Sequence, residues 1–218
     1  MNISAPGYAL CRTTYKSILG EKARVVSTTC DLDGTIVPLQ NAQDWPGLGR
    51  YLSEKVKELA QQGADFVIMP ANSVHFAYDH IEKPIPVLNL VEIVANTCAQ
   101  QGYTHAAILG VQFTMQGHLY RNALQQNGIK ECVPTEEDQT VLEHVIREQI
   151  LKDKTPNTAQ VLDIMRRMRT SGCDVAILAC TELPLIVNEM NAPMPYIDST
   201  RLLAKDAAAY ALLCTSQP

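Results

Sequence analysis

Two stretches decide the fold class of this chain: Ala64–His75 (ADFVIMPANSVH) and Asp174–Pro184 (DVAILACTELP). Each consists of an apolar run with an aspartate at its start, followed by a short polar loop and the beginning of a helical segment. Apolar runs without alternation are typical of strands buried on both faces, as in a parallel sheet. A helical segment ending in glycine, at Gly63 and at Gly172, precedes each stretch. The chain is therefore predicted to contain two similar α/β halves.

The rest of the chain continues this alternation of strands and helices. The expected strands are Ala23–Thr29, Ala64–Met69, Pro86–Leu88, His105–Leu109, Asp174–Leu178 and the shorter Pro195–Ile197. The expected helical faces carry Leu52, Val56 and Leu59; Val141, Val145 and Ile146; and Val161, Ile164, Met165 and Met168. Such alternation predicts an α/β fold with a mainly parallel sheet, and the two similar stretches predict two pseudo-symmetric parallel-sheet lobes. We expect the active site in the cleft between them. We expect residues 1–97 with 195–218 to form the first lobe, and 98–194 the second.

Composition narrows the class of protein. The 218 residues carry a net charge of −5, which argues against a nucleic-acid surface. A hydrophobic content of 46% is too high for a disordered chain. No apolar run approaches the roughly 20 residues of a membrane span, and the N-terminus lacks a signal-peptide layout. Seven cysteines without a CxxC pair argue against a disulfide scaffold or a metal site and favour a cytoplasmic protein with reduced thiols.

The loops after the strands are where a parallel sheet binds ligands. These segments are Cys30–Thr35, Pro70–His75, Gly110–Met115, Cys180–Glu182 and Asp198–Thr200. They are rich in Asn, Ser and Thr, and they suit a small carboxylate better than a metal or a large cofactor.

Cys180 is the cysteine most suited to chemistry. It ends an apolar strand, and the following Thr181-Glu182 pair is typical of the first turn of a helix. We expect a thiol at such a helix N-terminus to be stabilised as the thiolate. The other six are interpreted as packing or structural residues: Cys11, Cys30, Cys98, Cys132, Cys173 and Cys214.

Three further features have competing interpretations. Asp31–Thr35 (DLDGT) resembles the first motif of the haloacid dehalogenase phosphatases, but it also reads as a polar turn. His75 follows the Asn72-Ser73 pair at helical spacing and is interpreted as a capping or supporting residue. The segment around Trp45 (NAQDWPGLGR) is predicted to be a surface loop.

Four motifs occur in the order and spacing of one family. They are Pro70–His75 (PANSVH), Gly110–Met115 (GVQFTM), Ala179–Leu185 (ACTELPL) and Ile197–Thr200 (IDST). Together they resemble the aspartate/glutamate racemase superfamily, the cofactor-independent racemases, over about residues 7–213. The resemblance implies that two cysteines on opposite faces of the substrate Cα remove and return the α-proton. It also implies a homodimer, a small amino-acid or carboxylate substrate and no cofactor.

The resemblance assigns roles to residues of this chain. Cys180 matches the second catalytic cysteine, and Ala71 stands where the family has the first. The implied substrate contacts are Asn72, Ser73, Thr114, Thr181 and Glu182, supported by His75 and Asp198. Acidic amino-acid members of the family use basic residues for the side-chain carboxylate, and the candidates here are Arg50, Lys152 and Lys154.

Two departures from the family pattern leave the activity open. The N-terminal strand of the family has only Met1–Ile3 as its counterpart here, and alanine at position 71 can neither take nor give a proton. Ala71 is either an engineered Cys→Ala change in a racemase or a natural feature. A natural one-cysteine protein would be a decarboxylase or protonating enzyme, like the arylmalonate decarboxylases of the family. A non-catalytic carboxylate-binding protein and a magnesium-dependent DxDGT phosphatase are the remaining alternatives.

Overall fold

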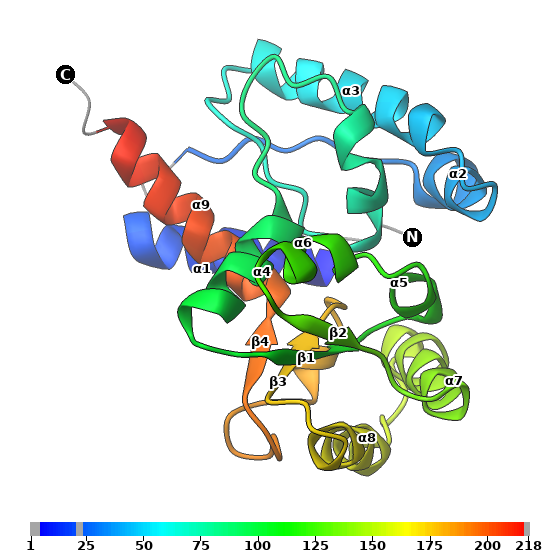
Figure 1. Ribbon diagram of the computed structural model, residues 1–218. Helices are drawn as coiled ribbons and strands as arrows, with labels where there is room; N and C mark the ends of the chain where they lie inside the picture. The colour runs from blue at the N-terminus through cyan, green and yellow to red at the C-terminus, as the bar shows by residue number, and fades with distance from the viewer. Residues whose placement is uncertain (1–4, 21–23, 216–218) are drawn as a thin grey trace. The chain divides into compact units, whose positions relative to one another are not determined.

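The computed structural model of the chain describes residues 5–20 and 24–215, without the side chains of 5–11 and 215 (Figure 1). The expected strand at Met1–Ile3 lies outside these residues. The described residues form two compact units, one made of those up to 90 and from 203 onward, the other of 91–202. The lobe boundaries expected from the sequence, at 97/98 and 194/195, remain a prediction.

The second unit is built around a parallel sheet of four strands. These are β1 (His105–Leu109), β2 (Lys130–Cys132), β3 (Val175–Leu178) and β4 (Tyr196–Asp198), in the order β2-β1-β3-β4. Every neighbouring pair is parallel. The connecting helices are α4 (Leu90–Gln100), α5 (Gln112–Gln116), α6 (Arg121–Gln126), α7 (Glu136–His144) and α8 (Thr158–Thr170), and α9 (Ser199–Thr215) follows β4 (Figure 1). Shorter helical turns span Val145–Gln149, Ile150–Lys152 and Leu183–Leu185.

The α/β fold class is confirmed, and within the second unit the apolar runs predicted the interior strands well. β1 and β3 lie within one residue of their predicted limits, and every residue of β3 is buried. The predicted face of α8 is buried as well, at Val161, Ile164, Met165 and Met168. The strand that sequence reasoning missed is β2. Its three residues include Lys130 and Glu131, charged residues that are typical of an edge strand rather than of an apolar run.

The first unit packs its helices around an apolar core. Its elements are α1 (Ala5–Leu19), a π-helical turn (Leu32–Ile36), α2 (Val37–Asn41), α3 (Trp45–Gln61) and a 3-10 helix (Ser73–His80). α3 buries Leu48, Leu52 and Val56 against the 3-10 helix and the segments on either side of it. The core also includes Ile36, Val67, Met69, Val74, Ala77, Ile81 and Val87.

The main difference between prediction and structure concerns the strands that were expected in the first unit. Val67 and Val87 form one isolated parallel bridge, and Ala64–Met69 and Pro86–Leu88 otherwise form no ladder with the described residues. The described part of the predicted strand Ala23–Thr29, residues 24–29, forms no ladder either. An apolar run becomes a strand only where a neighbouring backbone is in place to pair with it.

The prediction of a loop around Trp45 is also wrong. α3 begins at Trp45, because the carboxylate of Asp44 accepts a hydrogen bond from the N–H of Gly47 at 2.8 Å and a proline occupies the first turn. Gly47 and Leu48 are buried, whereas Arg50 is exposed on this helix. The proline and the glycines belong to a helix start here, not to a turn.

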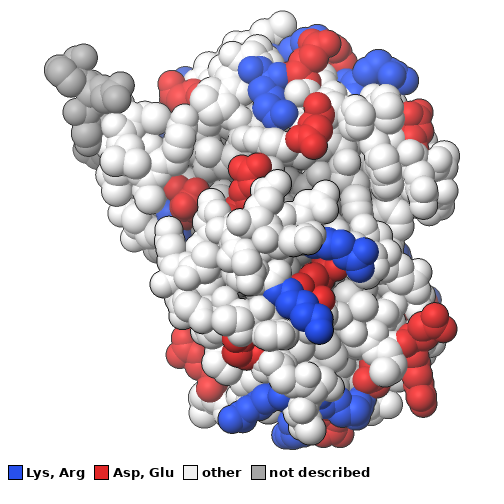
Figure 2. Space-filling model, in the orientation of Figure 1, with Lys and Arg blue, Asp and Glu red and all other residues white. Residues whose placement is uncertain are grey.

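The surface carries acidic and basic groups together. Figure 2 shows Lys and Arg interspersed with Asp and Glu on the face in view. Within residues 5–20 and 24–215, no helix has the length and apolar character that crossing a lipid bilayer requires.

The interior position of β3 leads to a stability prediction. Ile177 is fully buried between its partners Ile108 on β1 and Ile197 on β4. We expect Ile177→Ala to lower the free energy of unfolding by about 3 kcal/mol, because it leaves a cavity in the sheet core. Leu185→Ala, at a side chain that is 62% exposed, is the control and should change it by less than about 0.5 kcal/mol. Urea denaturation followed by circular dichroism measures both, and equal effects would contradict the assignment of β3 to the core.

Candidate active site

The carboxyl ends of β1, β3 and β4 gather most of the residues predicted for the site in the second unit. Because these strands are parallel neighbours, the segments that follow them leave the sheet at one edge. Thr114 lies on α5 after β1, Cys180 lies after β3, and Asp198 ends β4. Thr181 and Glu182 follow Cys180 directly, and both are buried.

The loops after β1 and β3 pass very close to each other. A Cβ on Gly110 would lie 2.9 Å from the carbonyl oxygen of Ala179, the residue before Cys180. Any other residue at position 110 would push these two loops apart. The glycine therefore sets how closely the Thr114 and Cys180 segments approach.

Cys180 is a buried thiol with a carboxylate as its partner. Its Sγ donates a hydrogen bond to Oε2 of Glu182 at 2.9 Å. Burial raises the pKa of Cys180 well above its ordinary value, and the negative charges of Glu182 and Glu143 raise it further. A backbone hydrogen bond at Glu182 acts in the opposite direction and is outweighed. At neutral pH this side chain is a thiol, a proton donor.

The expected thiolate at a helix N-terminus is therefore wrong. After Cys180 the chain makes only a 3-10 turn, Leu183–Leu185, which lacks the aligned dipoles of a longer helix. The position of Cys180 after the strand agrees with the prediction, but burial of the thiol, together with the carboxylate two residues away, reverses the predicted direction of the pKa shift.

Thr114 offers a hydrogen-bonding group that the protein does not use. The side chain is 1% exposed, and its Oγ1 has no hydrogen-bond partner among the described residues. Buried hydroxyl groups nearly always have a partner, because leaving one unpaired costs about 1–3 kcal/mol. Thr114 stands on a short helix rather than in the predicted loop.

α7 supplies two polar groups that sequence reasoning missed. Oε2 of Glu143 accepts the backbone N–H of Gln112 at 2.8 Å and so holds the start of α5. Gln139 is buried, and its Oε1 has no hydrogen-bond partner among the described residues. The two residues are four apart and share one helix face. The spacing of four residues between Gln139 and Glu143 is the sequence signal for this polar face.

Asp198 and Ser199 secure the turn from β4 into α9. The carboxylate of Asp198 accepts the backbone N–H of Arg201 at 2.9 Å. Ser199 Oγ donates to the carbonyl of Leu178 at 2.8 Å, which ties α9 to the end of β3. In the structure Asp198 is thus a helix-capping residue.

In the first unit, the Ala71–His75 loop is held by a buried histidine. His75 Nδ1 lies 2.9 Å from the carbonyl oxygen of Ala71, and Nε2 accepts the N–H of Leu90 at 3.3 Å. These contacts fit a neutral imidazole protonated on Nδ1. Burial lowers the pKa of His75 to about 4, although its backbone hydrogen bonds act in the opposite direction. Asn72 is buried too, and Ser73 Oγ accepts a hydrogen bond from Nε2 of Gln40 at 3.1 Å.

The basic candidates are surface residues. Arg50 is exposed on α3. Lys152 is exposed and paired with Glu148 at 2.6 Å, and Lys154 is exposed as well. Their part in binding a side-chain carboxylate remains a prediction.

Asp31 uses its carboxylate within its own turn. Oδ1 accepts the N–H of Gly34 and Oδ2 accepts the hydroxyl of Thr35, both at 3.0 Å. The polar-turn interpretation of the DLDGT segment is thereby confirmed, and the expected preceding strand is not formed. Among residues 5–20 and 24–215, no three His, Cys, Asp or Glu side chains are grouped as a metal site requires.

The remaining cysteines differ in how deeply their side chains are buried. Cys98 and Cys173 are buried, as predicted for packing residues, and Cys30 and Cys132 are half-buried. Cys214 is exposed, which contradicts a packing role, because the last turn of α9 faces solvent. The side chain of Cys11 lies outside the described part of the chain.

Solved structures that share this architecture include racemases of the Asp/Glu type. A candidate Asp/Glu racemase from Yersinia pestis superposes with a TM-score of 0.84 at 27% identity, covering 96% of this chain and 94% of that one. An aspartate racemase homologue from Pyrococcus horikoshii OT3 shares the fold, with a TM-score of 0.80 at 22% identity and 96% coverage of both chains.

The chain belongs to the Asp/Glu/Hydantoin racemase family, whose sequence profile matches residues 18–207. Broad specificity amino-acid racemase RacX of Bacillus subtilis is 25% identical over 70% of this chain and 67% of its own length. A glutamate racemase of Koribacter versatilis is 30% identical over 74% of this chain, and the matched part spans 58% of that enzyme. Homologues of this chain are therefore amino-acid racemases, which are isomerases.

The Cys180–Glu182 contact leads to a prediction about thiol reactivity. Glu182→Gln removes a negative charge that raises the pKa of Cys180, so the pKa should fall and the thiolate fraction at pH 8 should rise. We expect alkylation of Cys180 by iodoacetamide to accelerate about tenfold. Glu189→Gln, at an exposed site in the same segment, should leave the rate unchanged. Peptide mass spectrometry separates Cys180 from the other thiols, and an unchanged or slower rate in Glu182→Gln would contradict this coupling.

His75 makes the first unit sensitive to acid. Its pKa is lowered from 6.5 to about 4 in the folded chain, so its contribution to stability is complete above pH 6.5 and is lost as the pH falls toward 4. The loss amounts to about 3 kcal/mol. Urea unfolding followed by the fluorescence of Trp45 at pH 7 and pH 4.5 measures it. His75→Gln should flatten this pH dependence, whereas His80→Gln, at an exposed histidine, should preserve it. Equal profiles for the two variants would contradict the assignment.

Proposed function

We propose that this chain transfers the α-proton of an amino acid through Cys180, as an isomerase-type protein that uses no pyridoxal cofactor. The observation that carries the proposal is the buried Cys180 thiol, hydrogen-bonded to Glu182 at 2.9 Å on a strand-end loop of a racemase-family chain. We take the substrate class from the family, an amino acid with a second carboxylate such as aspartate or glutamate.

Each step of this chemistry has a candidate group. The ammonium group of a bound amino acid brings positive charge to the site, which favours the thiolate, and Glu182 is placed to accept the thiol proton. The thiolate then takes the proton from Cα: the C–H bond breaks, an S–H bond forms and the electron pair moves onto the substrate carboxylate. Hydrogen-bond donors stabilise that charge, and the unpaired Thr114 hydroxyl is one such group. Asn72, Ser73 and Thr181 are proposed as further contacts of the substrate.

Alanine at position 71 restricts this proposal to one thiol. With Cys180 alone, the proton returns to the face from which it left, so solvent exchange occurs without inversion. A racemase that carries a Cys→Ala change and a natural one-cysteine protein both fit this behaviour.

A second candidate function is decarboxylation followed by protonation by Cys180. The raised pKa of Cys180 supports it, because a protonated thiol can deliver a proton to a carbanion without first being deprotonated. The arylmalonate decarboxylase structure shares the fold, with a TM-score of 0.52 over 78% of this chain. Release of CO₂ from an arylmalonate, abolished by Cys180→Ala, distinguishes this function from amino-acid exchange.

The proposed proton transfer is tested by incubating the chain with each enantiomer of aspartate and glutamate in D₂O. NMR should show loss of the α-proton signal for one enantiomer of a substrate, with no accumulation of the other. Cys180→Ala should abolish this exchange, and Cys98→Ala, at a buried thiol outside the site, should retain it. Exchange that survives in Cys180→Ala would overturn the role of Cys180.

Placing a cysteine at position 71 tests whether the chain derives from a racemase that uses two catalytic cysteines. Ala71 is half-buried, and we expect Ala71→Cys to convert exchange into racemisation, with deuterium in both enantiomers. Ala71→Ser adds a group of similar size with a much less acidic proton, and it should exchange one enantiomer only. Polarimetry and chiral chromatography measure the outcome. Equal behaviour of the two variants would contradict a second catalytic position at 71.

We also propose, from the family resemblance alone, that the chain is cytoplasmic and forms a homodimer. Light scattering coupled to size-exclusion chromatography tests the second statement directly.

A further inference from the structure

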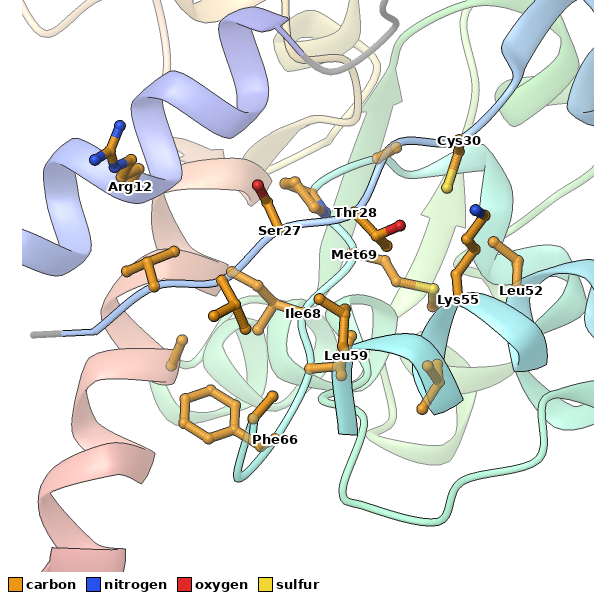
Figure 3. A pocket seen from close by; sticks show the side chains of 18 of the residues that line it. Arg12, Ser27, Thr28, Cys30, Leu52, Lys55, Leu59, Phe66, Ile68 and Met69 are labelled. Carbon is orange, nitrogen blue, oxygen red and sulfur yellow. The ribbon is translucent and has the colours of Figure 1, made fainter. Parts of the chain in front are cut away.

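Two extended segments of the first unit share one apolar interior and lead to neighbouring parts of the chain. Residues 24–30 and 64–71 line a common cavity of about 290 Å³. Figure 3 shows Cys30 at the end of the first segment and Met69 near the end of the second. After Cys30 the chain forms a polar turn and then α2, and after Met69 it forms the loop that carries Ser73. The shared interior thus keeps α2 close to this loop.

Near its end, α2 carries a buried glutamine whose backbone is held in place. Only 8% of Gln40 is exposed. Its carbonyl accepts the backbone N–H of Gln43 at 3.0 Å. The carbonyl of Leu39 accepts the N–H of Asp44 at 2.9 Å, and Ile36, just before α2, is buried in the core. A polar side chain in such a position has to find its hydrogen bonds within the protein.

The partner of Gln40 is the hydroxyl group of Ser73. Nε2 of Gln40 donates a hydrogen bond to Ser73 Oγ at 3.1 Å. An amide nitrogen only donates, so Ser73 is the acceptor in this bond and its single proton points elsewhere. A hydroxyl group that accepts one hydrogen bond donates more strongly in the next, because the two bonds polarise each other. Gln40 therefore prepares Ser73 to act as a donor.

The backbone around Ser73 is fixed independently of Gln40. The N–H of His75 donates to the carbonyl of Asn72 at 3.0 Å, and His75 Nδ1 lies 2.9 Å from the carbonyl oxygen of Ala71. Val74, the next residue, is buried in the core of the unit. What remains free at Ser73 is rotation of its side chain and of its O–H bond, and the bond from Gln40 restricts both.

We propose that Gln40 is a positioning residue that fixes Ser73 as a hydrogen-bond donor and so makes this loop selective for a free carboxylate group on the substrate. Hydrogen bonds to a charged acceptor are stronger than those to a neutral carbonyl, so a fixed donor favours an acid over the corresponding amide. Gln40 acts through Ser73 and does not itself touch the substrate. This inference rests on the proposed function, in which Ser73 contacts the substrate.

Gln40→Glu tests the inference, because it reverses the polarity of the hydrogen bond with little change in shape. The new carboxylate only accepts, so Ser73 has to turn its proton toward it and away from the substrate. At pH 8.5 we expect the KM for α-proton exchange of aspartate or glutamate to rise at least about tenfold. The dissociation constant from isothermal titration calorimetry should rise equally. At pH 5 the effect should be smaller, since a protonated carboxyl group donates as the amide does.

Three further variants separate this role from simple packing. Gln40→Met keeps the length of the side chain but has no donor, and it should raise both constants about threefold, because Ser73 is then free to rotate. In a Ser73→Ala background, substitutions of Gln40 should have no further effect, since the bond that they alter is gone. Gln43→Glu adds the same charge at an exposed site nearby and should leave both constants unchanged. Circular dichroism checks the folding of each variant, and the Gln40→Met and Ser73→Ala cycle decides the question if Gln40→Glu does not fold.

The outcomes distinguish this inference from the proposed function. Equal binding by Gln40→Glu and the unchanged chain at pH 8.5 would overturn the inference, as would equal effects of Gln40→Met with and without Ser73. Failure of the unchanged chain to bind aspartate or glutamate would overturn it as well. Binding that depends on Gln40 without any α-proton exchange would support the inference and refute the proposed function. Exchange that does not depend on Gln40 would do the reverse.

Discussion

The parallel pairing of β1 with β3 is the interaction on which the candidate site depends. It aligns Leu109 with Leu178, so that the segments carrying Thr114 and Cys180 leave the sheet side by side. Gly110 keeps them close, because a side chain there would meet the carbonyl of Ala179. Ser199 adds a hydrogen bond to Leu178, which joins the start of α9 to the same edge. Two buried interior strands thus hold polar groups that would not stay together on flexible loops.

The protonation state of Cys180 follows from its surroundings at this edge of the sheet. A buried cysteine holds its proton more tightly because low polarity penalises the thiolate, and a neighbouring carboxylate strengthens that effect. A thiol of this kind needs a change in its surroundings before it can act as a base. In the proposed mechanism, the ammonium group of the ligand provides that change, so binding and activation of the thiol would be coupled. Without a bound ligand, a thiol of this kind also resists oxidation, because the thiolate is the reactive form.

Sequence reasoning reached the architecture of the second unit because its interior strands are continuous apolar runs and its helices have clear periodicity. It placed Cys180 correctly after β3, but it missed the direction of the pKa shift, since that depends first on burial of the thiol and then on how Glu182 folds back onto the sulfur. It missed the buried polar groups of α7, because burial of Gln139 is set by packing with other elements. In the first unit, the runs at 24–29 and 64–69 have strand-like composition, yet a ladder needs a neighbour that composition cannot supply. At Trp45, capping by Asp44 overrode the usual preference of proline and glycine for turns.

Among the described residues, Phe66, Ile68 and residues 25–30 make no backbone-to-backbone hydrogen bond, and this has a consequence for how the chain behaves in concentrated solution. Unpaired strand edges next to apolar side chains are templates for pairing between like chains. Arg12, Arg24 and Lys55 line a cavity of the first unit together with one acid, Asp65, so the charged groups of the lining have a positive excess and two copies that approach through it repel each other. Lys55 is partly neutralised by Glu58 at 3.2 Å, and Asp65 offsets one arginine, so the remaining positive excess is small. Solubility of the chain should therefore depend more on salt than its modest net charge suggests, because added ions screen this local repulsion.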